Sequence, residues 1–224
     1  MIKTKYLCIE GTEGVGKTTQ VNLLTKILRN KGYSVIATKE PGTPLVPLTM
    51  ELRNIVLNNK YDNEITPIAR ELLTQAIRSI HLEKVILPAM GKYDYIIQDR
   101  GMLSALAYGT ACGNSPDFIH SLMRHLLPEQ QDIYHLYDTV IYMRGDSIAG
   151  LQRAINTKQE YIAGDVMESR GNDFISRVDR EMLKYSELFS CVKVDVDGRS
   201  IEDIHSEIMS KVILSKELNY GKDF

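Results

Sequence analysis

Eight residues near the start of the chain, Gly11–Thr18, constrain its fold more than any other part of the sequence. They read GTEGVGKT, the G-x-x-x-x-G-K-[ST] pattern of a phosphate-binding loop, and they directly follow the apolar run Tyr6–Ile9. An apolar pattern with the period of a helix then extends over Lys17–Asn30. The order predicts a strand, a tight glycine turn and a helix, whose backbone N–H groups together hold the phosphates of a nucleoside triphosphate.

Individual residues of this loop have expected roles in binding phosphate and Mg²⁺. The glycines let the backbone curl around an anion, Lys17 can reach the β- and γ-phosphates, and the Thr18 hydroxyl can ligate Mg²⁺. A chance match in an ordinary strand–helix turn is the alternative, but the flanking strand and helix argue against it. The residues that we expect to bind ATP are Gly11, Gly14, Gly16, Lys17, Thr18 and Thr19.

Composition narrows the class of protein. A chain of 224 residues suits a single domain, residues 1–224, with a mobile insert. The net charge of −2 argues against a protein built for stable nucleic-acid binding. The three widely spaced cysteines have no metal-ligand pattern and fit a reducing cytosol. Without a signal-peptide pattern or a membrane-length apolar stretch, we expect a cytoplasmic protein with no membrane partner.

Short apolar runs alternate with helical patterns along the whole chain. This alternation predicts an α/β fold with a five-stranded parallel sheet covered by helices on both faces. The expected strands are Tyr6–Glu10, Ser34–Thr38, Tyr95–Gln98, Thr139–Met143 and Val192–Val196. The expected helices are Lys17–Asn30, Leu45–Leu57, Pro67–Ala89, Leu103–Cys112, Pro116–Leu127, Ser147–Ala154, Asp173–Phe189 and Ile201–Leu214. In such a sheet the ligand lies at the carboxyl ends of the strands.

Charged residues follow two more of the expected strands. Glu40 comes after the second strand, where a carboxylate near bound phosphates could hold Mg²⁺ through water. The third strand leads into Asp99, the position of a Walker-B carboxylate that orients the Mg²⁺ shell, and Arg100 follows. An exposed salt bridge would also explain Asp99 and Arg100, so their spacing alone leaves both interpretations open.

Three arginines and one irregular segment could complete a phosphate site. Arg53, Arg78 and Arg153 lie on helices expected to flank the cleft, and guanidinium groups bind phosphate oxygens through paired hydrogen bonds. Helical arginines are also common on solvated faces, and spacing does not decide between the two. Residues 156–171 have mixed charge, two glycines and no apolar face. They form either a plain loop or a lid that closes over the nucleotide.

Taken in order, these motifs resemble the thymidylate kinase family over nearly the whole chain. The segments that carry the resemblance are Glu10–Thr19, Lys39–Thr43, Leu52–Leu57, Leu72–His81, Asp99–Gly109 and Gly150–Ala154. The resemblance implies a P-loop NTPase fold with a mobile lid, a homodimer, and Mg²⁺-assisted phosphoryl transfer from ATP to a deoxynucleoside monophosphate.

The resemblance also implies roles for individual residues. Glu13 would accept a hydrogen bond from the sugar 3′-hydroxyl, and Arg53 and Arg100 would hold the acceptor monophosphate. Tyr108 would lie under the deoxyribose and penalise a 2′-hydroxyl, while Arg78 would face the base and phosphate side. The implied catalytic residues are Lys17, Asp99, Arg100 and Arg153, and the implied metal site is Thr18 and Asp99. The implied acceptor site is Glu13, Glu40, Arg53, Thr74, Arg78, Arg100, Gly101, Ser104 and Tyr108.

The sequence departs from the family pattern in the acceptor pocket. Thr74 stands where the family has a phenylalanine that stacks on thymine. Gly101 replaces an aromatic residue or histidine, and Gly109 replaces a glutamine. All three changes remove side-chain volume, so we predict a roomier base pocket than in ordinary thymidylate kinases.

A second group of departures concerns positive charge near the γ-phosphate. The lid arginine of the family is Val166 here, and Gly14 stands where one subclass has a catalytic arginine. We therefore expect either Lys158 or Arg170 to supply the missing charge, or Arg153 to carry it alone.

The sequence thus predicts a kinase that phosphorylates a deoxynucleoside monophosphate, foremost dTMP, with ATP and Mg²⁺. One alternative is a kinase for a deoxynucleotide with a larger base or a bulky 5-substituent, as the vacated pocket suggests. Another is a regulatory protein that binds nucleotide without catalysis, as the missing lid arginine suggests. Retention of Lys17, Thr18, Asp99 and Arg100 argues against the regulatory protein.

Overall fold

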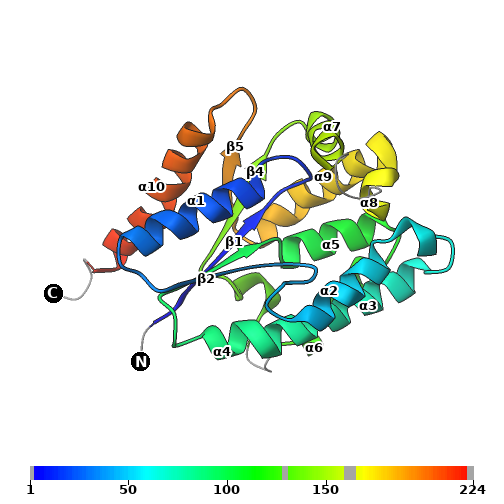
Figure 1. Ribbon diagram of the computed structural model, residues 1–224, viewed down its shortest axis with the longest axis horizontal. Helices are drawn as coiled ribbons and strands as arrows, with labels where there is room; N and C mark the ends of the chain where they lie inside the picture. Colours follow the sequence, from blue (N-terminus) through cyan, green and yellow to red (C-terminus); the bar gives the residue numbers. More distant parts are fainter. Residues whose placement is uncertain (1–2, 128–130, 159–164, 221–224) are drawn as a thin grey trace.

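A five-stranded parallel sheet forms the centre of the protein. The computed structural model describes residues 3–127, 131–158 and 165–220 (Figure 1). The strands are β1 (Lys5–Glu10), β2 (Val35–Lys39), β3 (Tyr95–Asp99), β4 (Thr139–Arg144) and β5 (Val192–Asp195), in the order β2-β3-β1-β4-β5. Each lies within one residue of its predicted bounds, and the parallel sheet is confirmed.

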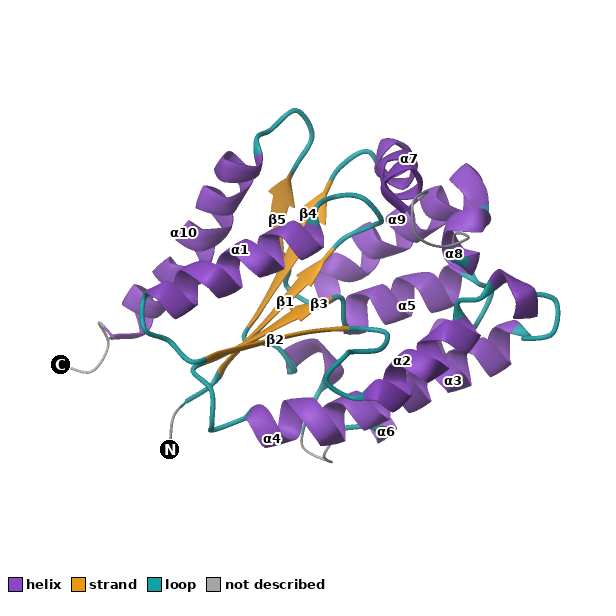
Figure 2. Ribbon diagram, in the orientation of Figure 1, coloured by secondary structure: helices purple, strands orange, loops and turns teal. Residues whose placement is uncertain are grey.

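The central strand β1 shows why the sheet needs helices on both faces. Leu7 and Ile9 point to one side, where they join the core formed with α1 (Lys17–Asn30) and α10 (Ile201–Tyr220). Tyr6 and Cys8 belong to the core on the other side, against α5 (Met102–Ala111) and α9 (Gly171–Leu188). Figure 2 shows the sheet between these two helical layers. A strand buried on both faces reads as a continuous apolar run, and Tyr6–Ile9 form such a run in β1.

The remaining helices are α2 (Pro47–Val56), α3 (Pro67–His81), α4 (Leu87–Ala89), α6 (Pro116–His125), α7 (Ser147–Lys158) and α8 (Val166–Ser169). The predicted helix Pro67–Ala89 is continuous, but it passes through a π-helical turn, η2 (Leu82–Ile86), between α3 and α4. Pro88 has no N–H to donate to the preceding turn, which favours such a widened turn.

Helix α8 was not predicted, because it lies in the segment that has no apolar face. Asp165 starts it by accepting hydrogen bonds from the backbone N–H groups of Met167 (2.9 Å) and Glu168 (3.1 Å). Such an N-cap compensates for orphan donors at the start of a short helix. No helix within the described ranges is long and apolar enough to cross a membrane.

Candidate active site

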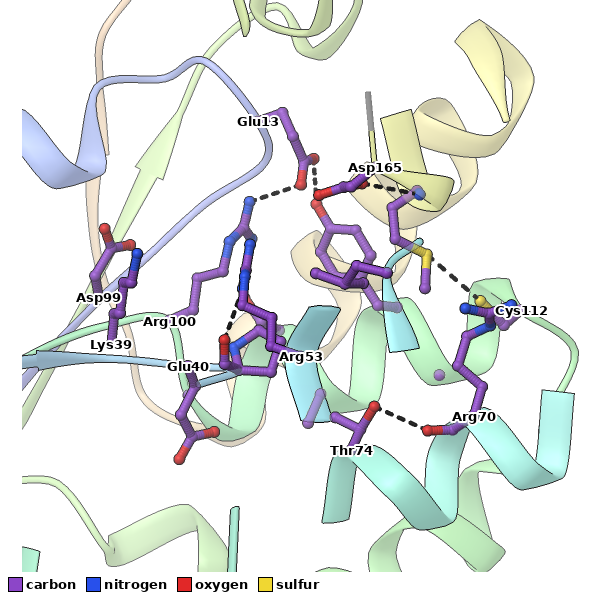
Figure 3. A pocket seen from close by; sticks show the side chains of 18 of the residues that line it. Glu13, Lys39, Glu40, Arg53, Arg70, Thr74, Asp99, Arg100, Cys112 and Asp165 are labelled. Atoms are coloured by element: carbon purple, nitrogen blue, oxygen red, sulfur yellow. Dashed lines mark hydrogen bonds and ion pairs between the residues drawn. The ribbon is translucent and has the colours of Figure 1, made fainter. Parts of the chain in front are cut away.

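A cavity of about 340 Å³ lies at the carboxyl ends of β1, β2 and β3 (Figure 3). Residues of α2, α3, α5 and the start of α8 complete its wall. Most of the predicted site residues line it, namely Glu13, Gly14, Lys17, Thr18, Glu40, Arg53, Thr74, Arg78, Asp99, Arg100, Gly101, Ser104 and Tyr108. The carboxyl-edge location expected for the ligand therefore agrees with the structure.

The phosphate loop has the backbone conformation that its glycines permit. Gly11, Gly14 and Gly16 all have positive φ angles, of 149°, 67° and 92°. Lys17, buried at the start of α1, donates to the carbonyl of Thr12 at 2.6 Å. Burial and the nearby charge of Arg100 lower the pKa of Lys17 to about 8. A bound phosphate would favour the charged form of this lysine.

Thr18 and Asp99 provide oxygen ligands suited to Mg²⁺. The Thr18 hydroxyl donates to Asp99 Oδ2 at 2.6 Å, so the first turn of α1 and the end of β3 meet at this point. The described residues hold no cluster of three or more His, Cys, Asp or Glu that could bind a metal alone. A hydroxyl and one carboxylate fit a cation that takes its other ligands from water and nucleotide phosphates, as Mg²⁺ does.

The structure explains why no arginine occupies position 14. A Cβ on Gly14 would overlap the carbonyl oxygen of Gly150 in α7, and its φ of 67° is unfavourable for other residues. Gly150 in turn packs against the backbone of Glu13. This close approach brings α7 onto the phosphate loop, where Arg153 Nε donates to the Gly14 carbonyl at 3.2 Å. Among the predicted sources of positive charge, Arg153 therefore lies at the loop itself.

A second cluster, beside the loop, contains Glu13, Arg100 and Tyr108. Arg100 Nη2 lies 2.8 Å from Glu13 Oε1, and the Tyr108 hydroxyl donates to Glu13 Oε2. Burial alone would raise the pKa of Glu13, but the charges of Arg100 and Lys17 lower it overall. Arg100 adopts a left-handed conformation with φ of 65°, which is strained for a residue with a side chain. Its Nη1 also donates to the Gly11 carbonyl at 2.8 Å. Arg100 thus ties the acceptor side of the cavity to the phosphate loop.

Glu10 is a residue of this cluster that sequence reasoning missed. It ends β1, is fully buried, and accepts hydrogen bonds from the N–H of Gly101 at 2.7 Å and from the Ser104 hydroxyl. Burial raises its pKa. Ser104 Oγ also accepts from Arg100 Nη1 at 3.2 Å. Ser104, expected to contact the acceptor, is therefore occupied in orienting Arg100 and the start of α5. The signal in the sequence that could have identified Glu10 is a carboxylate at the end of a buried strand.

Arg53 reaches the same region from α2. Its Nη1 donates to the Pro41 carbonyl at 2.6 Å, and burial lowers its pKa. Figure 3 shows Arg53 beside Arg100, and each guanidinium affects the other electrostatically. Two adjacent guanidinium groups repel one another, and a bound phosphate would relieve that repulsion.

Glu40 has a different geometry from the one expected. Its Oε2 is 2.8 Å from Arg78 Nε and its Oε1 is 3.0 Å from His81 Nδ1, and all three side chains are buried. Figure 3 shows the Glu40 carboxylate turned away from Asp99. Because both oxygens are occupied, Glu40 orients Arg78 and His81, and the Mg²⁺ contact through water expected from the sequence is not supported.

The prediction of space at Gly101 and Gly109 is wrong, because other side chains fill it. A Cβ on Gly101 would overlap the hydroxyl of Tyr137 and lie 3.0 Å from Cys8 Sγ. A Cβ on Gly109 would lie 2.5 Å from Glu71 Oε2 and 2.7 Å from Ile119 Cδ1. Thr74, the third change, lines the cavity. Its hydroxyl donates to the Arg70 carbonyl at 2.9 Å (Figure 3).

The segment for which we predicted a loop or a lid, residues 156–171, is described only in part. Residues 159–164 and the side chain of Lys158 lie outside the described residues. Past them, the N–H of Val166 donates to the Leu57 carbonyl at 3.0 Å, so the start of α8 rests on the end of α2. Arg170 lies 3.2 Å from Asp62 Oδ1 and donates to Cys112 Sγ at 3.3 Å. Arg170 is therefore engaged with Asp62 and Cys112, and its expected role near the γ-phosphate stays a prediction.

The whole chain is similar to known proteins. The family description that matches residues 9–208 is "Thymidylate kinase". The thymidylate kinase of Francisella tularensis subsp. holarctica is 33% identical over 98% of this chain and 99% of its own length. That of Nitrosospira multiformis is 30% identical over 94% of this chain and 98% of its own. The crystal structure of thymidylate kinase from Ehrlichia chaffeensis superposes with a TM-score of 0.69 at 21% identity, covering 93% and 98% of the two chains.

Proposed function

The chain belongs to the thymidylate kinase family, and we propose that it transfers the γ-phosphoryl group of ATP to the 5′-phosphate of dTMP. It is a nucleoside monophosphate kinase, and its products are ADP and dTDP. An oxygen of the acceptor phosphate forms a bond to the γ-phosphorus, and the bond from that phosphorus to the β–γ bridging oxygen breaks. The leaving negative charge remains on the β-phosphate of ADP.

One observation supports this proposal: residues of the phosphate loop and two adjacent arginines line a single cavity, and we assign the first group to the donor site and the second to the acceptor site. The donor site consists of the loop N–H groups and Lys17. The acceptor site has the adjacent guanidinium groups of Arg53 and Arg100. Held in one cavity, the two phosphates would be aligned for in-line transfer, and exclusion of water would suppress ATP hydrolysis. When bound beside Thr18 and Asp99, Mg²⁺ would neutralise charge on the ATP phosphates.

The proposed enzyme works as a homodimer in the cytoplasm. Support for the dimer comes from apolar side chains on the outer surfaces of α2 and α3: Ile68 and Leu72 are 57% and 48% exposed, and Leu48 and Ile55 are also exposed. Residues 68 and 72 are one helical turn apart and share a face, as a dimer contact requires. Support for the cytoplasm comes from the three cysteines, all of which are free thiols.

A panel of acceptors tests the proposal. The wild-type protein is incubated with ATP, Mg²⁺ and each common deoxy- and ribonucleoside monophosphate, together with 5-substituted deoxyuridylates, and the diphosphates are separated by ion-exchange chromatography. We expect dTDP from dTMP and poor turnover of ribonucleotides, because the family resemblance implies that Tyr108 lies under the deoxyribose and penalises a 2′-hydroxyl. ATP binding without any diphosphate product would favour the non-catalytic alternative. Preference for a bulky 5-substituent would favour a kinase of modified nucleotides.

A further inference from the structure

The base end of the cavity contains a buried carboxyl group, Glu71, that the family resemblance did not assign. Glu71 lies on α3, is 6% exposed and lines the cavity. Its Oε1 accepts a hydrogen bond from Gln75 Nε2 at 2.7 Å. Among the described residues, no hydrogen bond reaches Oε2. That atom lies 2.5 Å from the position that a Cβ on Gly109 would take. Glu71 Oε2 therefore lies in the space that a side chain at position 109 would otherwise fill.

Gln75 fixes Glu71 relative to Arg78. Its side-chain oxygen accepts from Arg78 Nη1 at 2.8 Å, while its amide donates to Glu71. Arg78 Nε is held by Glu40 at 2.8 Å. Within the described part of the chain, Arg78 Nη2 has no hydrogen-bond partner. Positions 71, 75 and 78 are spaced i, i+4 and i+7, so one face of α3 presents a fixed acceptor and a fixed donor.

Two further polar residues, Arg70 and Asn114, line this end of the cavity. Within the described ranges, Arg70 Nε and Asn114 Oδ1 have no hydrogen-bond partner, and both residues are more than nine-tenths buried. With Thr74 in place of an aromatic ring, this end of the cavity offers hydrogen bonds rather than stacking.

We propose that Glu71 is a specificity-determining residue of this kinase, whose Oε2 accepts a hydrogen bond from N3–H of the acceptor base while Arg78 Nη2 donates to O4. This assignment rests on the proposed function. Thymine presents an acceptor at O4 and a donor at N3–H, which match the guanidinium and the carboxylate. Cytosine presents the reverse pair, so its amino group would face Arg78 and its N3 lone pair would face Glu71. Such a mismatch leaves buried groups unpaired and is strongly rejected.

The test substitution is Glu71→Gln, because the surrounding hydrogen bonds fix its orientation. Gln75 donates to position 71 and cannot turn, since Arg78 donates to its oxygen. The new amide must therefore point its oxygen at Gln75 and its N–H group at the base. That donor repels N3–H of thymine and suits the N3 lone pair of cytosine. The matched control is Glu83→Gln, an exposed carboxylate just beyond α3.

Values of kcat/KM for dTMP and dCMP are measured for wild type and both variants, with the KM for ATP and the melting temperature as controls. We expect kcat/KM for dTMP divided by kcat/KM for dCMP to fall at least ~30-fold in Glu71→Gln. The ATP KM should change less than about twofold, and Glu83→Gln should resemble wild type in every value. If the role of Glu71 were purely structural, kcat/KM would fall equally for dTMP and dCMP and the ratio of the two values would stay unchanged. That result would overturn the assignment.

A measurement on the wild type keeps the proposal testable if Glu71→Gln does not fold. N3-methyl-dTMP lacks the N3–H donor, and we expect its kcat/KM to lie roughly 100-fold or more below that of dTMP. Equal turnover of the two nucleotides would overturn the role of Glu71. Failure of the wild type to convert dTMP at all would instead count against the proposed function.

Discussion

The two ends of the cavity are constructed in different ways. The phosphate end is mostly backbone: glycine φ angles, loop N–H groups and the contact of Gly14 with Gly150 shape it. The base end is made of buried side chains that hold one another, from Glu71 through Gln75 and Arg78 to Glu40. A backbone site needs a fixed local sequence, whereas a side-chain site can be rebuilt from different residues. The first end therefore depends on local sequence, whereas the second depends on side chains that lie far apart in the sequence.

The largest expected effect concerns the stability of the base end. Glu40→Ala leaves the buried guanidinium of Arg78 without its carboxylate partner. We expect the free energy of unfolding to fall by about 3–5 kcal/mol, measured by urea denaturation. Glu83→Ala, at an exposed position, is the control and should stay close to wild type.

The same carboxylate predicts how stability depends on pH. Burial would raise the pKa of Glu40, but Arg78 and His81 lower it overall. Its contribution to stability is therefore complete above the unfolded-state pKa and is lost as the pH falls through the folded-state pKa. Glu40→Ala should lack this part of the acid dependence. A variant that kept both wild-type stability and wild-type acid sensitivity would contradict the buried arrangement.

The next effect concerns the phosphate end. Lys17→Ala removes the charge that we propose to reach the ATP phosphates, and we expect kcat to fall by roughly 10²–10³-fold in a coupled ADP assay. The melting temperature should not fall, because Lys17 is charged and buried and its removal relieves desolvation. Near-normal turnover of this variant would refute the donor site.

Substitution of Arg53 should reduce activity less than Lys17→Ala and should affect only the acceptor nucleotide. Arg53→Ala removes charge-assisted contacts to the acceptor phosphate worth roughly 1.5–3 kcal/mol. The KM for dTMP should rise accordingly, while the KM for ATP stays near its wild-type value. Arg29→Ala, on the far part of α1, serves as a control for loss of an arginine. An effect of Arg53→Ala on ATP alone would assign Arg53 to the other end of the cavity.

The smallest expected effect is on kcat, and it distinguishes Arg153 from Arg170 as the residue that replaces the charge of the family's lid arginine. Arg153→Gln, at the Gly14 carbonyl, should lower kcat roughly tenfold through loss of a charge-assisted contact. Arg170→Gln should change kcat less than about threefold, because Asp62 and Cys112 hold that guanidinium elsewhere. Turnover rates of the purified variants at saturating substrates decide the point. The opposite order would mean that the lid moves Arg170 to the phosphates.

The difference between the two ends also explains what the sequence could predict. The strand bounds and the phosphate loop were predicted because their signals are local: apolar runs, glycines and a lysine at fixed spacing. Glu40 and Gly101 were misjudged because their partners, Arg78 and Tyr137, lie 38 and 36 residues away. The i, i+4 spacing of Glu71 and Gln75 was visible in the sequence. That Gly109 leaves room for Glu71 depends on the packing of α3 against α5 and α6, which no local pattern gives.

Binding calorimetry on two variants tests the separation of donor and acceptor sites most directly. ATP and dTMP are each titrated into wild type, Lys17→Ala and Arg53→Ala, in the presence of Mg²⁺. We expect Lys17→Ala to weaken ATP binding at least ~10-fold and to leave dTMP binding nearly unchanged. We expect Arg53→Ala to weaken dTMP binding by a similar factor and to leave ATP binding nearly unchanged. Weakening of both ligands by either variant, or of neither, would contradict two separate phosphate sites in one cavity.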